Sequence, residues 1–406
     1  MSQQNATPSV PMPRSMASLA TAPGSMSAEE TRARASAQRR QLRHDNETDP
    51  PAPEPDREVE VWATAGERMP VGRATVFFTV DGSAPSETSP MVSMESVAVE
   101  WDDDAGFLTR WRAVLPPQPA GTTVRYRIAA WRRAEPARSA APDCWAQDGQ
   151  GFWYKHTGEA AISTFAYHVE PIEDACPDWV HDAVIYEIFL DRFHPGNAGG
   201  TFSGTAGPRA IHGGTLEGVR RAIPYLEDLG ITCIWLSPFC ASPSYHRYDA
   251  TDLYNVDPAL GTNDDLRRLI DEAHVRGMRV MMDFVPGHCS RQHPAFVDAR
   301  NDQSADTAGW FQFRQWPDHY RSFLDVSPSL PSFNGDDDGA RDHLIQSALQ
   351  WSGDYGIDAF RLDHAIGLSM DFWVAFRTAT RSVRPDIFTV GEATDTPECL
   401  RRYRGI

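Results

Sequence analysis

The second half of the chain alternates short apolar runs with amphipathic runs, and this alternation limits the folds open to it. Apolar residues recur at helical spacing between the short runs, as at Leu216, Val219, Ile223 and Leu226. Alternating strands and helices predict a parallel sheet, because parallel neighbours need a crossover connection. Such apolar strands need cover on both faces, which favours a TIM-type (β/α)8 barrel. Five apolar runs of strand length occur between about 179 and 391: AVIYEIF, ITCIWLSP, MRVMMDF, IDAFRLD and IFTVGEA.

Composition divides the chain into three parts. Residues 1–56 are rich in Pro, Ser, Ala and Arg and hold few large apolar side chains, so we expect a disordered extension. Residues 57–170 contain alternating runs such as VRYRIAAW, bounded by turn signals, and predict an all-β sandwich. Residues 175–406 would be the barrel, with an excursion at about 287–340. The sandwich has tryptophans for either a core or a carbohydrate-binding surface: Trp62, Trp101, Trp111, Trp131, Trp145 and Trp153.

Charge and cysteine usage exclude several classes of protein. The net charge of −18 argues against partners that are nucleic acids or anionic membranes. No apolar run is long enough to cross a bilayer, and the first residues lack the apolar centre of a secretory signal. The six cysteines form no CxxC pair, which argues against zinc and a disulfide framework. We therefore expect a cytoplasmic protein with a neutral, polar substrate.

Charged residues follow three neighbouring strands of the predicted sheet. Asp283 ends the third run, Arg361 and Asp363 end the fourth, and Glu392 ends the fifth, with His288 five residues after Asp283. One such acid alone would be a solvated loop residue or a helix cap. Barrel enzymes place catalysis at the carboxyl ends of their strands, so the whole set predicts an active site.

Two of these carboxyls suit the two roles in glycoside cleavage. Arg361 and Asp363 share one face of a strand, and a guanidinium beside a carboxylate keeps it ionised and oriented, as a nucleophile requires. We expect Glu392 to be partly desolvated near a like charge, which would raise its pKa and suit a general acid. Two carboxyls about 5–5.5 Å apart would define a retaining glycosidase. Water and carboxylates suffice for hydrolysis, so no cofactor is implied.

Several motifs resemble those of the α-amylase superfamily, glycoside hydrolase family thirteen. DFVPGH, GIDAFRLDHA and FTVGEA resemble three of its ordered signature regions. WVHDAVIYEIFLDRF is similar to the opening of the barrel in the neopullulanase, cyclomaltodextrinase and α-glucosidase branch, and SLPSFN at 329–334 to that branch's extra motif. YHRYDATDLYNVDPALGT at 245–262 resembles the segment that contributes to the first sugar subsite. The resemblance covers roughly 175–406 and, more weakly, 57–170.

The resemblance implies a role for each matching residue. Asp363 would form a covalent glycosyl intermediate, and Glu392 would protonate the glycosidic oxygen and then activate water. Arg361 would orient the nucleophile, and Asp283 would be a structural acid in the floor of the site. The three remaining matches would bind a glucose ring, two by hydrogen bonds and the tyrosine by stacking: His246, His288 and Tyr248.

The implied activity is hydrolysis of α-1,4 links, and in some members α-1,6 links, in short maltooligosaccharides. Two other interpretations stay open: an α-glucan transglycosylase, and a non-catalytic α-glucan-binding remnant. Members of the resembled branch form homodimers through the β-sandwich, and the residues of this chain leave its oligomeric state open.

Three departures from the family pattern qualify these expectations. Gly287 stands where an Asn that commonly serves a calcium site precedes the histidine, which argues against calcium. Ile366 and Gly367 replace a Lys-His pair that touches the sugar beyond the cleavage point, so acceptor-side preference stays open. The family barrel has eight strands and a third catalytic Asp, against five predicted strands here. We therefore expect a fragment of a larger enzyme, inactive or nearly so by itself.

Overall fold

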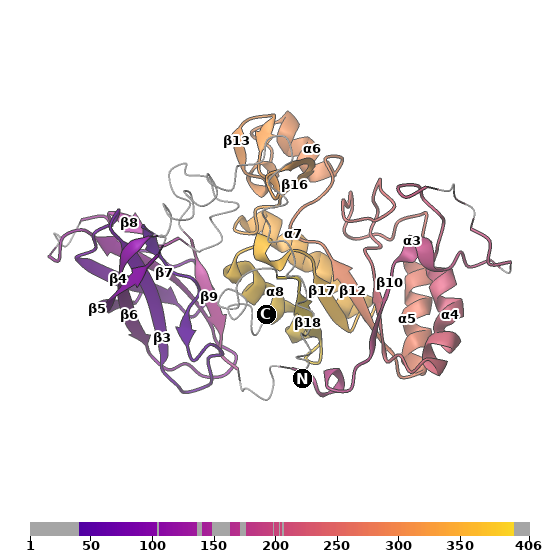
Figure 1. Cartoon of the computed structure of the whole chain (residues 1–406), viewed down its shortest axis with the longest axis horizontal. Coiled ribbons are helices and arrows are strands. Elements are labelled where there is room, and N and C mark those ends of the chain that lie inside the picture. Colours follow the sequence, from indigo (N-terminus) through magenta and orange to yellow (C-terminus); the bar gives the residue numbers. More distant parts are fainter. Residues whose placement is uncertain are drawn as a thin grey trace, which may run out of the picture.

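The computed structural model describes residues 40–103, 105–135, 140–147, 163–170, 176–197, 199–202, 204 and 207–393. These residues form an N-terminal antiparallel β unit and a C-terminal unit around a parallel sheet (Figure 1). Most of the predicted N-terminal extension, Trp153 and the last thirteen residues lie outside the described residues.

The described part of the N-terminal unit is one hydrogen-bonded sheet of nine strands. The long strand β5 pairs with β4 through its first residues and with β6 through its later ones. Side chains of β3 and β6 share one core with those of β4 and β7, so the sheet folds back on itself at β5. The strands are β1 Leu42–Arg43, β2 Thr48–Asp49, β3 Val59–Gly66, β4 Arg73–Thr79, β5 Met91–Asp102, β6 Gly106–Leu115, β7 Thr123–Trp131, β8 Cys144–Trp145 and β9 Phe165–His168.

The prediction that disorder extends to residue 56 was wrong for the end of that segment. Strands β1 and β2 both pair antiparallel with β3. Leu42 is 1% exposed, and the fully buried ring of His44 bonds through Nε2 to the Tyr126 hydroxyl at 2.7 Å. Two short strands can pair with β3 through backbone groups alone, and composition does not reveal such pairing.

The tryptophans of this unit occupy different environments. Trp111 and Trp131 are buried, as expected of core residues. Trp101 is 64% exposed, and its ring meets that of Phe107 edge to face with centroids 5.1 Å apart. Among the described tryptophans of this unit, Trp101 is therefore the most exposed to solvent.

The C-terminal unit has the parallel sheet that the alternation predicts. Its five described strands pair in chain order, and every pair is parallel. One face packs on the helices through a large apolar core, and the other carries a small cluster around Cys233, Met281 and Ala359. The strands are β10 Ile185–Ile188, β11 Cys233–Leu236, β12 Arg279–Phe284, β17 Ala359–Leu362 and β18 Phe388–Gly391.

Helices connect these strands, and an excursion follows β12. The connecting helices are α3 Leu190–Phe193, α4 Leu216–Asp228, α5 Asn263–Val275, α7 Asp338–Leu349 with the π-turn Gln350–Asp354, and α8 Met370–Val383. The excursion holds α6 Pro294–Asn301 and two hairpins, β13 Phe313–Gln315 with β14 His319–Tyr320, and β15 Ser322–Phe323 with β16 Ser327–Pro331. Short 3-10 turns lie at Asp178–Val180, Ala308–Trp310 and Ala365–Gly367.

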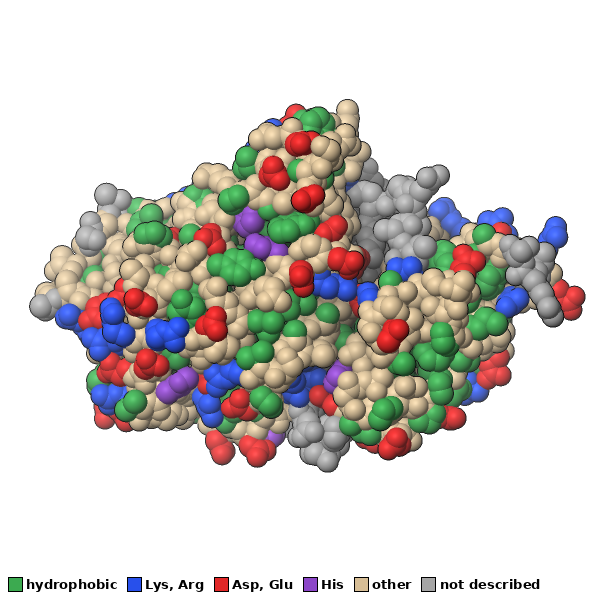
Figure 2. Space-filling view, turned by 180° about the vertical axis from the view of Figure 1, so that it is seen from behind, with side chains coloured by type: hydrophobic (Ala, Val, Ile, Leu, Met, Phe, Trp, Pro, Cys, Tyr) green, Lys and Arg blue, Asp and Glu red, His purple; other side chains and the backbone are tan. Residues whose placement is uncertain are grey.

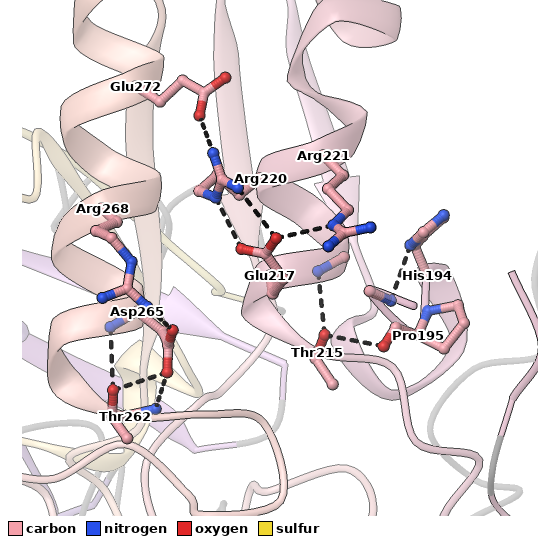
Figure 3. A network of polar contacts seen from close by, with 12 residues as sticks. His194, Pro195, Thr215, Glu217, Arg220, Arg221, Thr262, Asp265, Arg268 and Glu272 are labelled. Atoms are coloured by element: carbon pink, nitrogen blue, oxygen red, sulfur yellow. Dashed lines mark hydrogen bonds and ion pairs between the residues drawn. The ribbon is translucent and has the colours of Figure 1, made fainter. Parts of the chain in front are cut away.

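Polar side chains fix where α4 and α5 begin. Thr215 and Thr262 cap the two helices by accepting hydrogen bonds from backbone N–H groups of the first turns (Figure 3). Arg220 of α4 then bridges Glu217 of its own helix, at 2.7 Å, and Glu272 of α5, at 2.6 Å. The caps and this bridge hold the two helices side by side against the sheet.

Asp358 joins the amino ends of two central strands. Its side chain is 1% exposed and accepts hydrogen bonds from His274 Nε2 at 2.7 Å, Arg279 Nη1 and Arg384 Nη2 at 2.9 Å, and the Val280 backbone at 2.8 Å. Burial by itself would raise the pKa of Asp358, but these hydrogen bonds hold it below its usual value. The carboxylate therefore contributes to stability in its ionised form.

Replacing this carboxylate by an amide should destabilise the fold. Asp358→Asn removes the buried anion that Arg279 and Arg384 share and leaves them the longer contacts to Asp386, at 3.6 and 3.8 Å, so we expect a loss of about 3 kcal/mol in the free energy of unfolding at pH 7. Because the pKa of Asp358 is lowered in the folded state, its contribution is present above the unfolded value of about 3.9 and is lost as the pH falls through the folded value. Urea unfolding at several pH values should show the gap between the two proteins narrowing below about pH 4. A gap independent of pH would contradict this account.

Candidate active site

The guanidinium of Arg361 lies among three carboxylates at the carboxyl ends of β12, β17 and β18. Its Nη1 donates to Oδ1 of Asp283 and to Oδ1 of Asp363, both at 2.7 Å, and its Nη2 lies 3.0 Å from Oε2 of Glu392. The strands are in register, so Asp283 stands directly opposite Arg361. The structure therefore brings four of the predicted residues together, with the three carboxylates placed around the Arg361 guanidinium.

Burial dominates the electrostatics of the two aspartates. Asp283 is 1% exposed and Asp363 is 7% exposed. Burial raises the pKa of Asp363 to about 6; Arg361 opposes this rise, and the neighbouring Glu392 adds to it. Burial likewise raises the pKa of Asp283 to about 7, again against the effect of Arg361. With one guanidinium among three carboxyls, the cluster can hold a proton close to neutral pH.

Glu392 is partly covered by its neighbours, and 44% of its side chain is exposed where β18, the last described strand, ends. One carboxylate oxygen accepts a hydrogen bond from the His364 backbone at 2.9 Å, which fixes its direction toward Arg361. Asp363 is the more buried member of the pair, at 7% exposed, and the sequence did not predict this difference.

Two further predicted residues border the cluster. Tyr248 donates its hydroxyl to Oδ2 of Asp283 at 2.9 Å. His288 is 2% exposed, neither of its ring nitrogens has a hydrogen-bond partner, and its ring packs against Phe323 with centroids 4.7 Å apart. Burial lowers the pKa of His288 to about 4, so its ring is neutral at physiological pH. A buried imidazole with unused polar atoms is suited to bind a polar ligand.

The structure does not bring His246 to the carboxylates. Its side chain is 37% exposed, and its Nδ1 accepts a hydrogen bond from the Tyr248 backbone at 3.1 Å. Its ring is tilted against that of Tyr248, with centroids 6.0 Å apart. His246 therefore supports the loop that carries Tyr248.

Sequence reasoning missed Trp235 and Phe323 at this site and assigned no catalytic role to His364. The Arg361 guanidinium lies over the ring of Trp235, 5.6 Å from its centroid. His364 has a left-handed backbone (φ 46°), and its ring packs against Phe323 with centroids 4.9 Å apart. Period two along β11 could have placed Trp235 on the face of the charged residues. Phe323 comes from the excursion, and its approach is not encoded in local spacing.

Neither a metal centre nor a membrane span is found among the described residues. They contain no group of three or more His, Cys, Asp or Glu side chains placed to hold an ion. No helix in the described ranges has the length and apolarity to cross a bilayer.

Acidic and basic side chains are intermixed on the face shown in Figure 2.

Comparison with known sequences identifies the family. The family model described as "Alpha amylase, catalytic domain" matches residues 187–405, more than half of the chain. The chain belongs to the α-amylase family. This confirms the resemblance stated from its motifs, and the family's relatives named amylases, neopullulanases and cyclomaltodextrinases are glycosidases.

Individual relatives of this family member support the assignment. Alpha-amylase 2 of Dictyoglomus thermophilum is 37% identical over 255 residues, covering 63% of this chain and 44% of the relative. Neopullulanase 2 of Thermoactinomyces vulgaris is 34% identical over 265 residues, covering 60% and 45%. The type III pullulan hydrolase from Thermococcus kodakarensis superposes with a TM-score of 0.52 at 27% identity, over 90% of this chain and 64% of that one. The aligned part of this chain thus spans less than half the length of the amylase and the neopullulanase, and about two thirds of the pullulan hydrolase structure.

The charge of Glu392 should be detectable in the titration of Asp363. Glu392→Gln removes a negative neighbour, so the pKa of Asp363 should fall from about 6, but stay above about 3.9 because its burial remains. Carboxyl ¹³C shifts of Asp-labelled protein, recorded against pH and assigned with Asp363→Asn, would measure this. An unchanged Asp363 titration would show that the two carboxyls do not interact.

Proposed function

We propose that this chain carries the nucleophile and the acid/base of a retaining glycosidase that acts on α-linked glucooligosaccharides. The observation that carries the proposal is the Arg361 guanidinium, which binds Asp363 and Glu392 at once. Two carboxyls held by one guanidinium can flank a single glycosidic bond. Asp363, bound by Arg361 at 2.7 Å, suits the nucleophile, and Glu392 on the neighbouring strand suits the acid/base.

The reaction would take place in two displacements. In the first, the Asp363 carboxylate attacks the anomeric carbon, while Glu392 gives its proton to the departing glycosidic oxygen. In the second, Glu392 takes a proton from water, the water oxygen attacks the same carbon, and the bond to Asp363 breaks. Two inversions restore the original anomeric configuration, and both carboxyls return to their starting states.

The surrounding residues suit a neutral sugar. His288 matches the family histidine that binds a glucose hydroxyl, and we infer the same role for it here, since its ring nitrogens have no hydrogen-bond partner among the described residues. Tyr248 would offer its ring to the same sugar while its hydroxyl stays on Asp283. The names of relatives, a neopullulanase and a pullulan hydrolase among them, support an α-glucan as the substrate class.

We also propose that the parallel sheet is an arc of a (β/α)8 barrel. Strand order equals chain order, every pair is parallel, and the helices of the large core lie on one face only. In this arrangement the sheet face that carries Cys233, Met281 and Ala359 lines the barrel interior. The three carboxylates around Arg361 then lie at the carboxyl-terminal end of the barrel. A likeness to solved α-amylase-type structures over most of the chain supports this architecture.

A covalent intermediate on Asp363 is the direct test of the proposed function. The chain would be incubated with 5-fluoro-α-maltosyl fluoride, whose good leaving group lets the intermediate form and whose ring fluorine slows its breakdown. Mass spectrometry of peptides should locate one sugar on Asp363, and Asp363→Asn should lower labelling at least about 1,000-fold. Labelling at another residue would overturn the proposal, whereas an unlabelled chain would match the expectation that this part of an enzyme is inactive by itself.

Replacing the acid/base should separate its two duties. Glu392→Gln should slow cleavage of maltotriose about 10²–10⁴-fold, because the leaving alcohol then lacks a proton donor. Release of fluoride from α-maltosyl fluoride should suffer far less in the first turnover, since fluoride leaves unaided. Equal losses on both substrates would contradict the role of Glu392.

Chromatography of the products would show free sugars from a hydrolase and new glycosidic links from a transglycosylase.

The rate of the first displacement should depend on the ionisation of Asp363. Because burial raises the pKa of Asp363 to about 6, its nucleophilic form is lost as the pH falls through that value. The initial rate of labelling should therefore fall about tenfold for each pH unit below about pH 5 and level off above about pH 7. A rate that stays constant down to pH 4 would exclude Asp363, with this environment, as the nucleophile.

A further inference from the structure

A buried carboxylate on α8 joins the N-terminal β unit to the active-site half of the chain. Asp371, in the first turn of α8, is 2% exposed. Arg125 of β7 donates to both of its oxygens, with Nε 2.9 Å from Oδ1 and Nη2 2.8 Å from Oδ2, and Arg341 of α7 donates to Oδ2 at 2.7 Å. A fork of two parallel hydrogen bonds fixes direction as well as distance. Three elements that are far apart in sequence therefore meet at one carboxylate.

We propose that Arg125 and Asp371 are positioning residues for the two catalytic carboxyls, so that the N-terminal β unit forms part of the active-site framework. This inference rests on the proposed function of Asp363 and Glu392. It assigns to the β unit a task other than binding carbohydrate.

The chain between Asp363 and Asp371 is short and tightly connected to both catalytic groups. Only the 3-10 turn Ala365–Gly367 and its flanking residues separate the nucleophile from α8. The backbone N–H of Ala365 donates to the Glu392 carbonyl at 2.9 Å, and Trp373 of α8 donates its indole N–H to the Ala365 carbonyl at 2.8 Å. A shift of the first turn of α8 would therefore move this turn and, through it, the backbone beneath Glu392.

Stability of packing alone does not account for the Asp371 junction. Helix α8 is already anchored by apolar side chains, and Phe372, Trp373 and Phe376 are each at most 1% exposed. Burying ion pairs costs desolvation that offsets much of their attraction, so such pairs add little net stability but specify geometry closely. The junction thus fits a role in orienting the beginning of α8.

A second ionic contact between the same two units serves as an internal control. Glu170, just after β9, accepts from Arg377 and Arg381 on later turns of α8, with Arg381 Nη1 3.1 Å from Oε2. In Figure 1, β9 lies beside α8. This contact docks the same helix on the same unit, but farther from the turn that follows the nucleophile.

The test compares Arg125→Gln with Glu170→Gln in the full chain. Each variant removes one charge from an ion pair between the β unit and α8. Arg125→Gln should lower the rate of Asp363 labelling by 5-fluoro-α-maltosyl fluoride about ten- to hundredfold at saturating reagent, with less than a twofold change in the half-saturating concentration. Arg125→Lys, which can restore one of the two hydrogen bonds, should recover part of the rate. Glu170→Gln should change the rate less than twofold.

Hydrogen exchange gives a readout that does not depend on activity. Peptides covering 364–373 should exchange at least about fivefold faster in Arg125→Gln and stay unchanged in Glu170→Gln, with both proteins folded by circular dichroism. Equal exchange in these peptides for the two variants would overturn the inference, as would a labelling rate in Arg125→Gln within twofold of the unmodified chain. An adduct at a residue other than Asp363 would overturn the proposed function alone; if the unmodified chain forms no adduct, the exchange comparison decides whether Arg125 positions the turn.

Discussion

The guanidinium of Arg361 is the interaction on which the candidate site depends. Two buried aspartates and an exposed glutamate converge on it, and without a cation their repulsion would drive them apart or keep them protonated. Arg361 therefore offsets part of the cost of burying the charges of Asp283 and Asp363, although burial still raises the pKa of both. The stacking of the guanidinium on Trp235 of β11, which lies two strands away across β12, further limits its position.

The parallel sheet makes this convergence possible. Adjacent parallel strands in register present their carboxyl ends along one edge, so Asp283 and Arg361 become neighbours although 78 residues separate them. The amino ends of the same strands are also fixed. There Asp358 accepts hydrogen bonds from two arginines, a histidine and a backbone amide. The register that aligns the acids is thus fixed from both ends of the sheet.

The N-terminal unit and the parallel sheet meet through charged contacts on α8. Arg125 and Glu170 reach this helix at its beginning and along its later turns, and α8 connects the strand that precedes the nucleophile with the strand that precedes the acid. A likeness to the type III pullulan hydrolase over 90% of the chain spans both units. The β unit is therefore placed to influence the geometry of the site as well as the stability of the chain.

Local sequence determined the elements and singled out the candidate reacting groups. Short apolar runs that alternate with amphipathic helical segments predicted the parallel sheet. The positions of Asp283, Asp363 and Glu392 at the ends of successive strands predicted the candidate site. Strand pairing of 40–56 escaped prediction because backbone hydrogen bonds leave no mark on composition. Packing decided the rest: Asp283 and Asp363 become buried only when the strands pair and the helices cover the sheet, and Phe323 and Arg125 act across contacts between distant segments. Those contacts exist only once the chain has packed, so tertiary structure alone settles the electrostatics and the support of the site.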